Sequence, residues 1–246
     1  MKRILLLCSL FVLFAANAAA QKEKSWTEWN VKDAQKMLTD SAWAQSQSEF
    51  TEAPPSGSTI TATQRANAIS LPSAQNTESG ETLGRKGTAL SAKYHVAFLT
   101  AKPVRAAFIR LMELQRPETP AEQVAEWRAF VAKDLGDYIV VSLILDGTDQ
   151  QKVVPVKKYL SGANQETFKD IVYLERKDGK RVALVNYRAP SADGMGAKFI
   201  FPRTLEGQPF LDANSGEVRV YMEIGKTKLT RRFKVADMMY GGKLEY

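Results

Sequence analysis

The single histidine, His95, is the residue from which any imidazole chemistry would have to come. A Ser-His-Asp mechanism or a histidine acid–base mechanism would depend on this ring, because the chain contains no other. His95 lies in an alternating stretch, on the strand face that also carries Ala97 and Leu99. No nucleophile motif such as Gly-x-Ser-x-Gly or Ser-x-x-Lys accompanies it. We therefore interpret His95 as a structural residue.

Carboxylates are the second source of chemistry, since two of them suffice for glycoside hydrolysis. The candidates Asp146, Asp149 and Asp170 fall in predicted loops, where Asp is a common turn residue. A zinc site normally needs three or four His, Cys or carboxylate ligands, and the only cysteine is Cys8. We predict no catalytic residue, no metal ligand and no bound cofactor. A carboxylate-dependent hydrolase that acts on an envelope polymer stays open as the alternative function.

Two partial motifs for phosphate chemistry lack an essential residue. The stretch 224–227 ends like a phosphate-binding loop, but Val220 stands where that motif requires its first glycine. The stretch 141–148 is similar to the first motif of haloacid-dehalogenase-type phosphatases, but Ile144 occupies the position of their nucleophilic aspartate. Neither stretch therefore indicates phosphoryl transfer.

Tryptophans gather near the start of the predicted mature chain. Trp26, Trp29 and Trp43 fall within 18 residues and are three of the four tryptophans. Such rings could form a binding face for a sugar or for a hydrophobic partner. Alternatively, they attach the first helices to the domain. These three residues are the candidate partner-binding residues of the chain.

The N-terminus has the three-part layout of a secretory signal peptide. Lys2 and Arg3 precede an almost wholly apolar run over 4–16, and the small residues 17–20 precede Gln21. The apolar run is shorter than the roughly 20 residues that span a bilayer. We expect residues 1–20 to be cleaved as a signal peptide, with no transmembrane segment afterwards. The predicted location is periplasmic or extracellular.

The predicted mature chain, residues 21–246, contains no cysteine, which excludes disulfides and thiolate catalysis. Loss of the signal peptide lowers the net charge from +7 to +5, short of a nucleic-acid-binding signature. The basic run over 226–234 could attract an anionic polymer, although acidic residues interleave with it. The expected partner is an envelope protein or an anionic envelope polymer, and no nucleic acid is expected.

A sequence motif near the N-terminus resembles the start of certain exported proteins of soil bacteria. It reads Trp26-x-x-Trp29, then Lys32-Asp33-Ala34, then Met37-Leu38-Thr39-Asp40-Ser41-x-Trp43-Ala44. The likeness extends to 103–105 and to the final hundred residues. Those proteins carry a signal peptide and have no assigned activity. The resemblance implies export and contributes no catalytic residue.

The chain divides into four segments by composition. After the signal peptide, residues 21–51 are predicted to be an N-terminal helical segment, with Asn30 and Asp33 as a helix cap and Asp40-Ser41 as a second cap. A short strand over 46–51 could join the later sheet. Residues 52–88 are rich in Ser, Thr, Ala, Gln, Asn and Gly, which predicts a low-complexity, disordered loop. Residues 89–246 are predicted to be an α+β domain.

A strand–helix–helix–strand unit over 91–145 is the predicted kernel of this domain. Its first strand has period-two alternation, and Pro103 stands at the start of the first helix. A capping box over 119–122 predicts the second helix, whose apolar stripe is formed by Val124, Trp127, Val131 and Leu135. The apolar run over 138–145 predicts a central, covered strand. The structure of residues 153–160 is ambiguous, because Pro155 interrupts the run.

Two antiparallel hairpins are predicted to extend the kernel. The first joins 171–176 to 181–187 around Asp178-Gly179, and 197–201 forms a further alternating strand. The second hairpin joins 217–224 to 227–235 around Gly225-Lys226. Its register predicts cross-strand pairs between Glu223 and Lys228 and between Glu217 and Lys234, with Arg231 as an exception on the apolar face.

Together these patterns predict an α+β fold with short N-terminal helices and antiparallel hairpins. The function that we expect is non-enzymatic binding or scaffolding by an exported envelope protein. A third possibility, pairing of a hairpin edge with another chain, would require a long uncovered strand.

Overall fold

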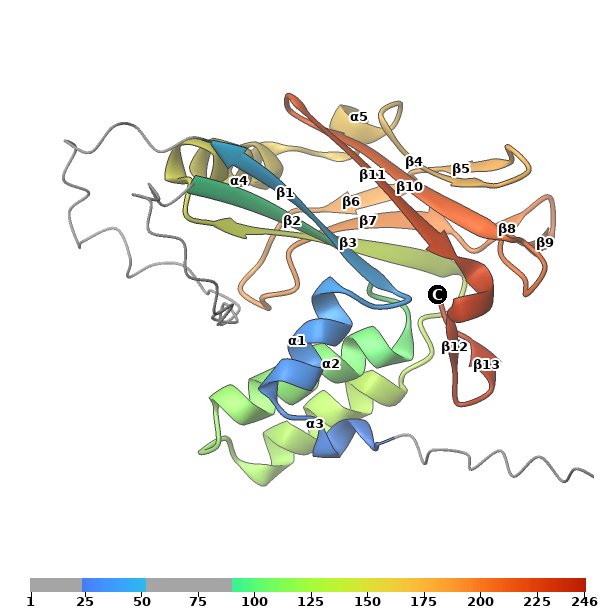
Figure 1. Cartoon of the computed structure of the whole chain (residues 1–246). Coiled ribbons are helices and arrows are strands. Elements are labelled where there is room, and N and C mark those ends of the chain that lie inside the picture. Colours follow the sequence, from blue (N-terminus) through green and yellow to red (C-terminus); the bar gives the residue numbers. More distant parts are fainter. Residues whose placement is uncertain (1–23, 52–89) are drawn as a thin grey trace, which may run out of the picture.

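The computed structural model describes residues 24–51 and 90–246 (Figure 1). The predicted signal peptide, residues 1–20, and the predicted loop over 52–88 lie outside the described residues. The described chain is α+β, as the sequence predicts. Its helical elements are η1 (Trp26–Glu28), α1 (Val31–Thr39), α2 (Lys102–Gln115), α3 (Ala121–Ala132), α4 (Gln150–Gly162), α5 (Gln165–Phe168) and η3 (Val235–Asp237).

Two antiparallel sheets form the centre of the fold. Sheet A has the order β1 (Ala44–Thr51), β2 (Leu90–Phe98), β3 (Tyr138–Gly147), β7 (Ala197–Pro202) and β6 (Asn186–Arg188). Sheet B has the order β11 (Thr227–Lys234), β10 (Glu217–Ile224), β4 (Val172–Arg176) and β5 (Arg181–Ala183). Two short two-stranded ribbons pair β8 (Thr204–Leu205) with β9 (Gln208–Pro209), and β12 (Met239–Tyr240) with β13 (Lys243–Leu244).

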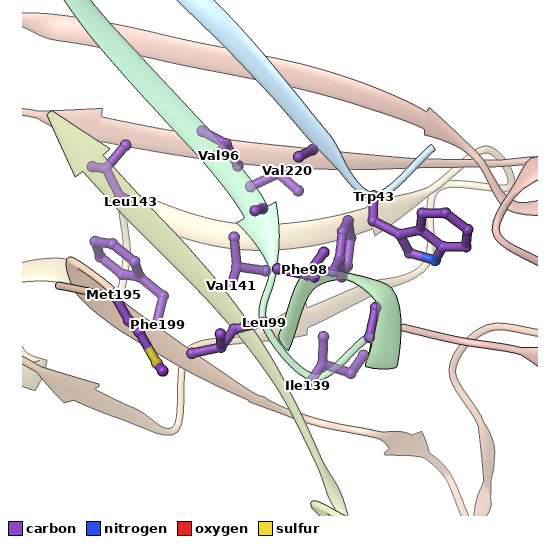
Figure 2. Close-up of a cluster of buried hydrophobic side chains, with 14 of the residues drawn as sticks. Trp43, Val96, Phe98, Leu99, Ile139, Val141, Leu143, Met195, Phe199 and Val220 are labelled. Atoms are coloured by element: carbon purple, nitrogen blue, oxygen red, sulfur yellow. The ribbon is translucent and has the colours of Figure 1, made fainter. Parts of the chain in front are cut away.

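The main core lies between the two sheets. Alternate residues of β2 and β3 face sheet B, and the Phe98 ring meets that of Phe233 edge to face with centroids 5.0 Å apart. Val141 of β3 and Phe199 of β7 are directly paired and fully buried in the same layer, with Val220 of sheet B nearby (Figure 2). We call this side of sheet A its sandwich face.

Helices α1, α2 and α3 lie together against the opposite side of sheet A, which we call its helix face (Figure 1). The kernel predicted from sequence is present, because β2, α2, α3 and β3 follow one another and β2 pairs directly with β3. Small residues Ala44, Ala97 and Ser142 lie side by side on this face and are buried. Their size lets the helices pack closely on the sheet.

The helix starts agree with the sequence in two cases and differ in a third. In α1, Asn30 and Asp33 form the predicted reciprocal cap, with Asp33 N donating to Asn30 Oδ1 at 2.9 Å. Pro103 stands in the first turn of α2 as predicted. The capping box predicted for α3 is wrong, because the Thr119 hydroxyl donates to the carbonyl of Arg116 and caps the preceding turn.

The second cap predicted at Asp40-Ser41 does not start a helix. Ser41 Oγ accepts from the backbone amides of Trp43 and Ala44, which turns the chain into β1. The strand predicted over 46–51 is confirmed and begins earlier, at Ala44. Because β1 pairs with β2 along its whole length, the N-terminal segment is part of the same sheet as the kernel.

The ambiguous stretch around Pro155 is helical. Asp149 caps α4 by accepting from Lys152 N, and Val153 and Leu160 are buried. Pro155 lies in the second turn, so the helix lacks one backbone hydrogen bond, to the carbonyl of the exposed residue Gln151. Water satisfies an exposed carbonyl, which explains why the helix continues through the proline.

The first predicted hairpin is correct at its turn and wrong in its second strand. The predicted strand over 181–187 divides into β5, which pairs with β4 in sheet B, and β6, which pairs with β7 in sheet A. Leu184 and Val185 carry the chain between the sheets at a corner of the sandwich, and Val185 N already bonds to Ile200 O. Both halves keep a buried centre, Val182 and Tyr187.

The second hairpin has the predicted register, with Glu223 opposite Lys228 and Glu217 opposite Lys234. Lys228 forms an ion pair with Glu223 at 3.4 Å, whereas Glu217 is paired with Arg232 at 3.3 Å. Arg231 does lie on the inner side, where its Nη2 donates to Gln47 Oε1 of β1 at 2.6 Å. This contact ties the edge strands of the two sheets together.

Candidate functional site

A cleft of about 550 Å³ opens between α2, α3 and the helix face of sheet A. This volume falls within the usual range of small-molecule sites. Most lining side chains are apolar, and four are charged. The lining residues are Leu99, Ile109, Met112, Glu126, Trp127, Phe130, Leu135, Tyr138, Val140, Arg188, Asp193, Met195, Lys198 and Ile200.

Strand alternation supplies the floor of the cleft. Val140 of β3 and Ile200 of β7 are directly paired, and their neighbours Val141 and Phe199 point into the sandwich. Lys198 precedes Ile200 by two residues and therefore lies on the same face. The floor is thus a continuous surface that is apolar at Ile200 and cationic at Lys198, about 7 Å away along β7.

Helix α3 forms a wall that is only lightly attached to the core. Val131 is its single buried residue, although Trp127 and Phe130 pack partly against the core. The stripe predicted from sequence is therefore only partly buried, and its tryptophan lines the cleft. A helix that buried this stripe fully would close the cleft.

Arg105 of α2 holds the end of this wall in place. Arg105 is 4 % exposed, and its Nη2 donates to the carbonyls of Val131 and Lys133, each at 3.0 Å. Nη1 donates to the Thr100 carbonyl, and the guanidinium lies 5.9 Å from the centroid of the Phe130 ring. Burial lowers the pKa of Arg105. The guanidinium satisfies carbonyls that the C-terminus of α3 leaves without helical partners.

Three charged side chains lie at the β6–β7 end of the cleft. Arg188 and Lys198 stand directly opposite each other on the paired strands. Asp193, in the connection between these strands, accepts from Lys198 Nζ at 2.7 Å and from Met195 N at 2.9 Å. These bonds position Met195, which is 9 % exposed, against the cleft. Like charges at opposed positions destabilise a ribbon, so Asp193 offsets part of this repulsion.

The protonation state of Asp193 follows from these contacts. Partial burial acts to raise its pKa, but the hydrogen bonds from Lys198, Met195 N and Ser191 outweigh burial, and the pKa is lowered. Asp193 is therefore ionised at neutral pH. A general acid for glycoside hydrolysis requires a raised pKa, so Asp193 does not suit that role.

His95 is buried and bridges two neighbouring strands. Its Nδ1 lies 2.7 Å from Ser46 Oγ of β1, and its Nε2 lies 3.2 Å from Asp146 Oδ2 of β3. The structure thus brings a serine, a histidine and an aspartate together, but with the two ring nitrogens exchanged relative to serine hydrolases. Ser46 Oγ also donates to the Thr39 carbonyl at 2.8 Å, so its proton is already used. The group cross-links three strands.

The other two acidic candidates lie apart from the cleft. Asp149 is 3 % exposed and combines its cap of α4 with a bond from Thr51 Oγ1 at 2.8 Å. Asp170 is exposed beside α5. Neither residue lines the cleft. The carboxylates that do line it, Glu126 and Asp193, were not among the candidates from sequence.

The candidate tryptophans are largely covered. Trp29 and Trp43 are 8 % and 6 % exposed, with their Nε1 atoms donating to the carbonyls of Lys24 and Glu245. Trp26 is half-buried against the core. These positions attach η1 and β1 to the domain and leave little ring surface for a partner. Their role in partner binding stays a prediction.

Sequence reasoning missed the cleft, although its signals were present. The apolar stripe that includes Trp127 does not show what it packs against, and the alternation of β7 places Lys198 and Ile200 on one face without showing what lies opposite. Arg188 directly follows the predicted strand over 181–187 and belongs to no predicted element. Only the packing of α2 and α3 over β3 and β7 assembles these residues.

Comparison with protein-family models, curated proteins and solved structures found no match for the chain. Among the described residues, no group of three or more His, Cys, Asp and Glu side chains could hold a metal ion. None of the helices in the described ranges is long and apolar enough to cross a membrane.

Proposed function

We propose that this chain is an exported, non-enzymatic binding protein of the cell envelope and that the cleft receives an apolar ligand. The observation that carries the proposal is a cleft of about 550 Å³ whose floor and walls are mainly aliphatic and aromatic. Water in the cleft forms few hydrogen bonds with apolar walls, so its replacement by an apolar ligand lowers the free energy. The layout of residues 1–20 supports export.

The chemistry of the nearby side chains favours binding over catalysis. The only histidine lies outside the cleft and is engaged with Ser46 and Asp146. Within the cleft, Asp193 is an ionised partner of Lys198, which removes it as a proton donor. The alternative function, a carboxylate-dependent hydrolase, would have to use Glu126 and an ionised Asp193.

Titration with the uncharged apolar dye N-phenyl-1-naphthylamine tests this proposal. Val140 lies on the cleft floor, so Val140→Phe fills part of the cleft without adding charge. Val154→Phe is the matched control, because Val154 is 55 % exposed on α4 and does not line the cleft. We expect the wild type and V154F to bind the dye alike and V140F to bind it at least about tenfold more weakly. Equal affinity in all three proteins would refute the proposal.

A further inference from the structure

One end of the cleft carries an uncompensated positive charge. Arg188 and Lys198 are cross-strand neighbours, and both line the cleft. Lys198 has Asp193 as its partner at 2.7 Å, and its side chain is only 14 % exposed. The guanidinium of Arg188 makes no hydrogen bond or ion pair with any described residue. One cation therefore remains available at this end.

We infer that the ligand carries a single anionic head group, a carboxylate or a phosphate, which binds Arg188 while its apolar body lies along Val140, Ile200 and Trp127. This inference rests on the proposed function and adds the class of ligand. A guanidinium presents a planar fork of donors that matches either anion. An anion at Arg188 would also relieve the repulsion between Arg188 and Lys198.

The cationic pair and the apolar floor lie close enough for one small amphiphile to contact both. Ile200 lies two residues from Lys198 on β7, so the apolar floor begins about 7 Å from the cationic pair. From a head group at Arg188, the chain therefore reaches Ile200 within a few methylene groups. An amphiphile satisfies both surfaces at once, whereas a wholly apolar ligand leaves Arg188 unpaired.

Glu126 on α3 is the one charge on the opposite wall, and it likewise lacks an ionic partner among the described residues. Its carboxylate repels an anion and so favours a head group held on the sheet side. A cationic head group at Glu126 is the competing arrangement. Its neighbours on the sheet, Arg188 and Lys198, disfavour it.

Calorimetric titrations with dodecanoate, dodecyl phosphate, dodecanol and dodecyltrimethylammonium distinguish these arrangements. We expect wild-type protein to bind one or both anions at least about tenfold more tightly than dodecanol. Arg188→Gln should abolish this preference and leave the affinity for dodecanol unchanged. The two anionic probes separate a carboxylate site from a phosphate site.

Matched variants keep the inference falsifiable. Arg116→Gln removes the same charge from an exposed position outside the cleft and should keep the preference for anions. Glu126→Gln should keep or increase it. Unchanged preference in R188Q, or tightest binding of the ammonium probe with loss in E126Q, would overturn the inference. If none of the probes binds, or if V140F binds dodecanol as the wild type does, the proposed function itself fails.

Discussion

At the scale of single residues, Asp193 makes the stability of the fold depend on pH. Its pKa is lowered in the folded protein from the ordinary value of 3.8. The ionised form therefore stabilises the native state above pH 3.8, and this contribution disappears as the pH falls through the lowered pKa. We predict that the free energy of unfolding of Asp193→Asn falls less steeply between about pH 6 and about pH 2.5 than that of the wild type.

Lys198→Met provides a second test of this prediction. It removes the ionic partner of Asp193 and should flatten the pH dependence in part, because Met195 N and Ser191 still donate to Asp193, as measured by urea unfolding at a series of pH values. An undiminished pH dependence in both variants would contradict the role assigned to the pair.

The sequence predicts the environment of single residues better than it predicts their contact partners. Alternation correctly gave His95 its face of β2, and the structural interpretation agrees with its contacts to Ser46 and Asp146. Those partners lie 49 and 51 positions away, and only the pairing of β1, β2 and β3 brings them together. The spacing of these residues along the chain does not predict that pairing.

At the scale of elements, Arg105 determines whether α3 stays in place over the cleft. We predict that Arg105→Met lowers the free energy of unfolding by about 3 kcal/mol, because carbonyls of Thr100, Val131 and Lys133 lose a charged donor. Urea unfolding measures this change. Arg116→Met is the control, since Arg116 is exposed, and it should change stability by less than about 0.5 kcal/mol.

Hydrogen exchange of the amides in α3 adds a local readout. In R105M these amides should exchange faster than in the wild type, while those of β3 should change less. An R105M protein that matches R116M in both stability and exchange would show that the buried guanidinium does not hold the helix.

At the element scale, side chains of β1 also cover part of the edge strand β11. Gln45 and Gln47 of β1 donate to the carbonyls of Arg232 and Lys228 on β11, at 2.6 Å and 3.3 Å. These side chains occupy part of the free edge of sheet B. The edge of the second hairpin is therefore partly covered, whereas pairing with another chain would require a long uncovered strand.

Elements with strong local signals were predictable, and those set by tertiary contacts were not. The cap at Asn30, the kernel and the register of the second hairpin follow from short-range patterns. The division of 181–187 between two sheets does not, although the alternation shifts by one residue at the corner, where Val185 and Asn186 are both exposed. The helix through Pro155 could not be predicted either. A proline normally breaks a helix, but here the carbonyl that loses its hydrogen bond lies on an exposed turn.

At the scale of the whole molecule, the fold class could be predicted and the cleft could not. The run over 138–145 is apolar on both faces, which predicts a strand covered on both sides. Alternation in β7 does not show what covers Ile200, which is paired with Val140. The helix face is instead covered only in part by α2 and α3, and the remaining apolar surface forms the cleft.

Methyl NMR of methionine- and isoleucine-labelled protein, titrated with dodecanoate, tests the central claim most directly. We predict chemical-shift changes at Met112, Met195, Ile109 and Ile200, which line the cleft, and none at Met222, which is fully buried between the sheets. Saturable changes confined to the cleft methyls would support it as the ligand site. No change in those methyls at saturating dodecanoate, or changes confined to Met37 beside Trp29, would contradict the account.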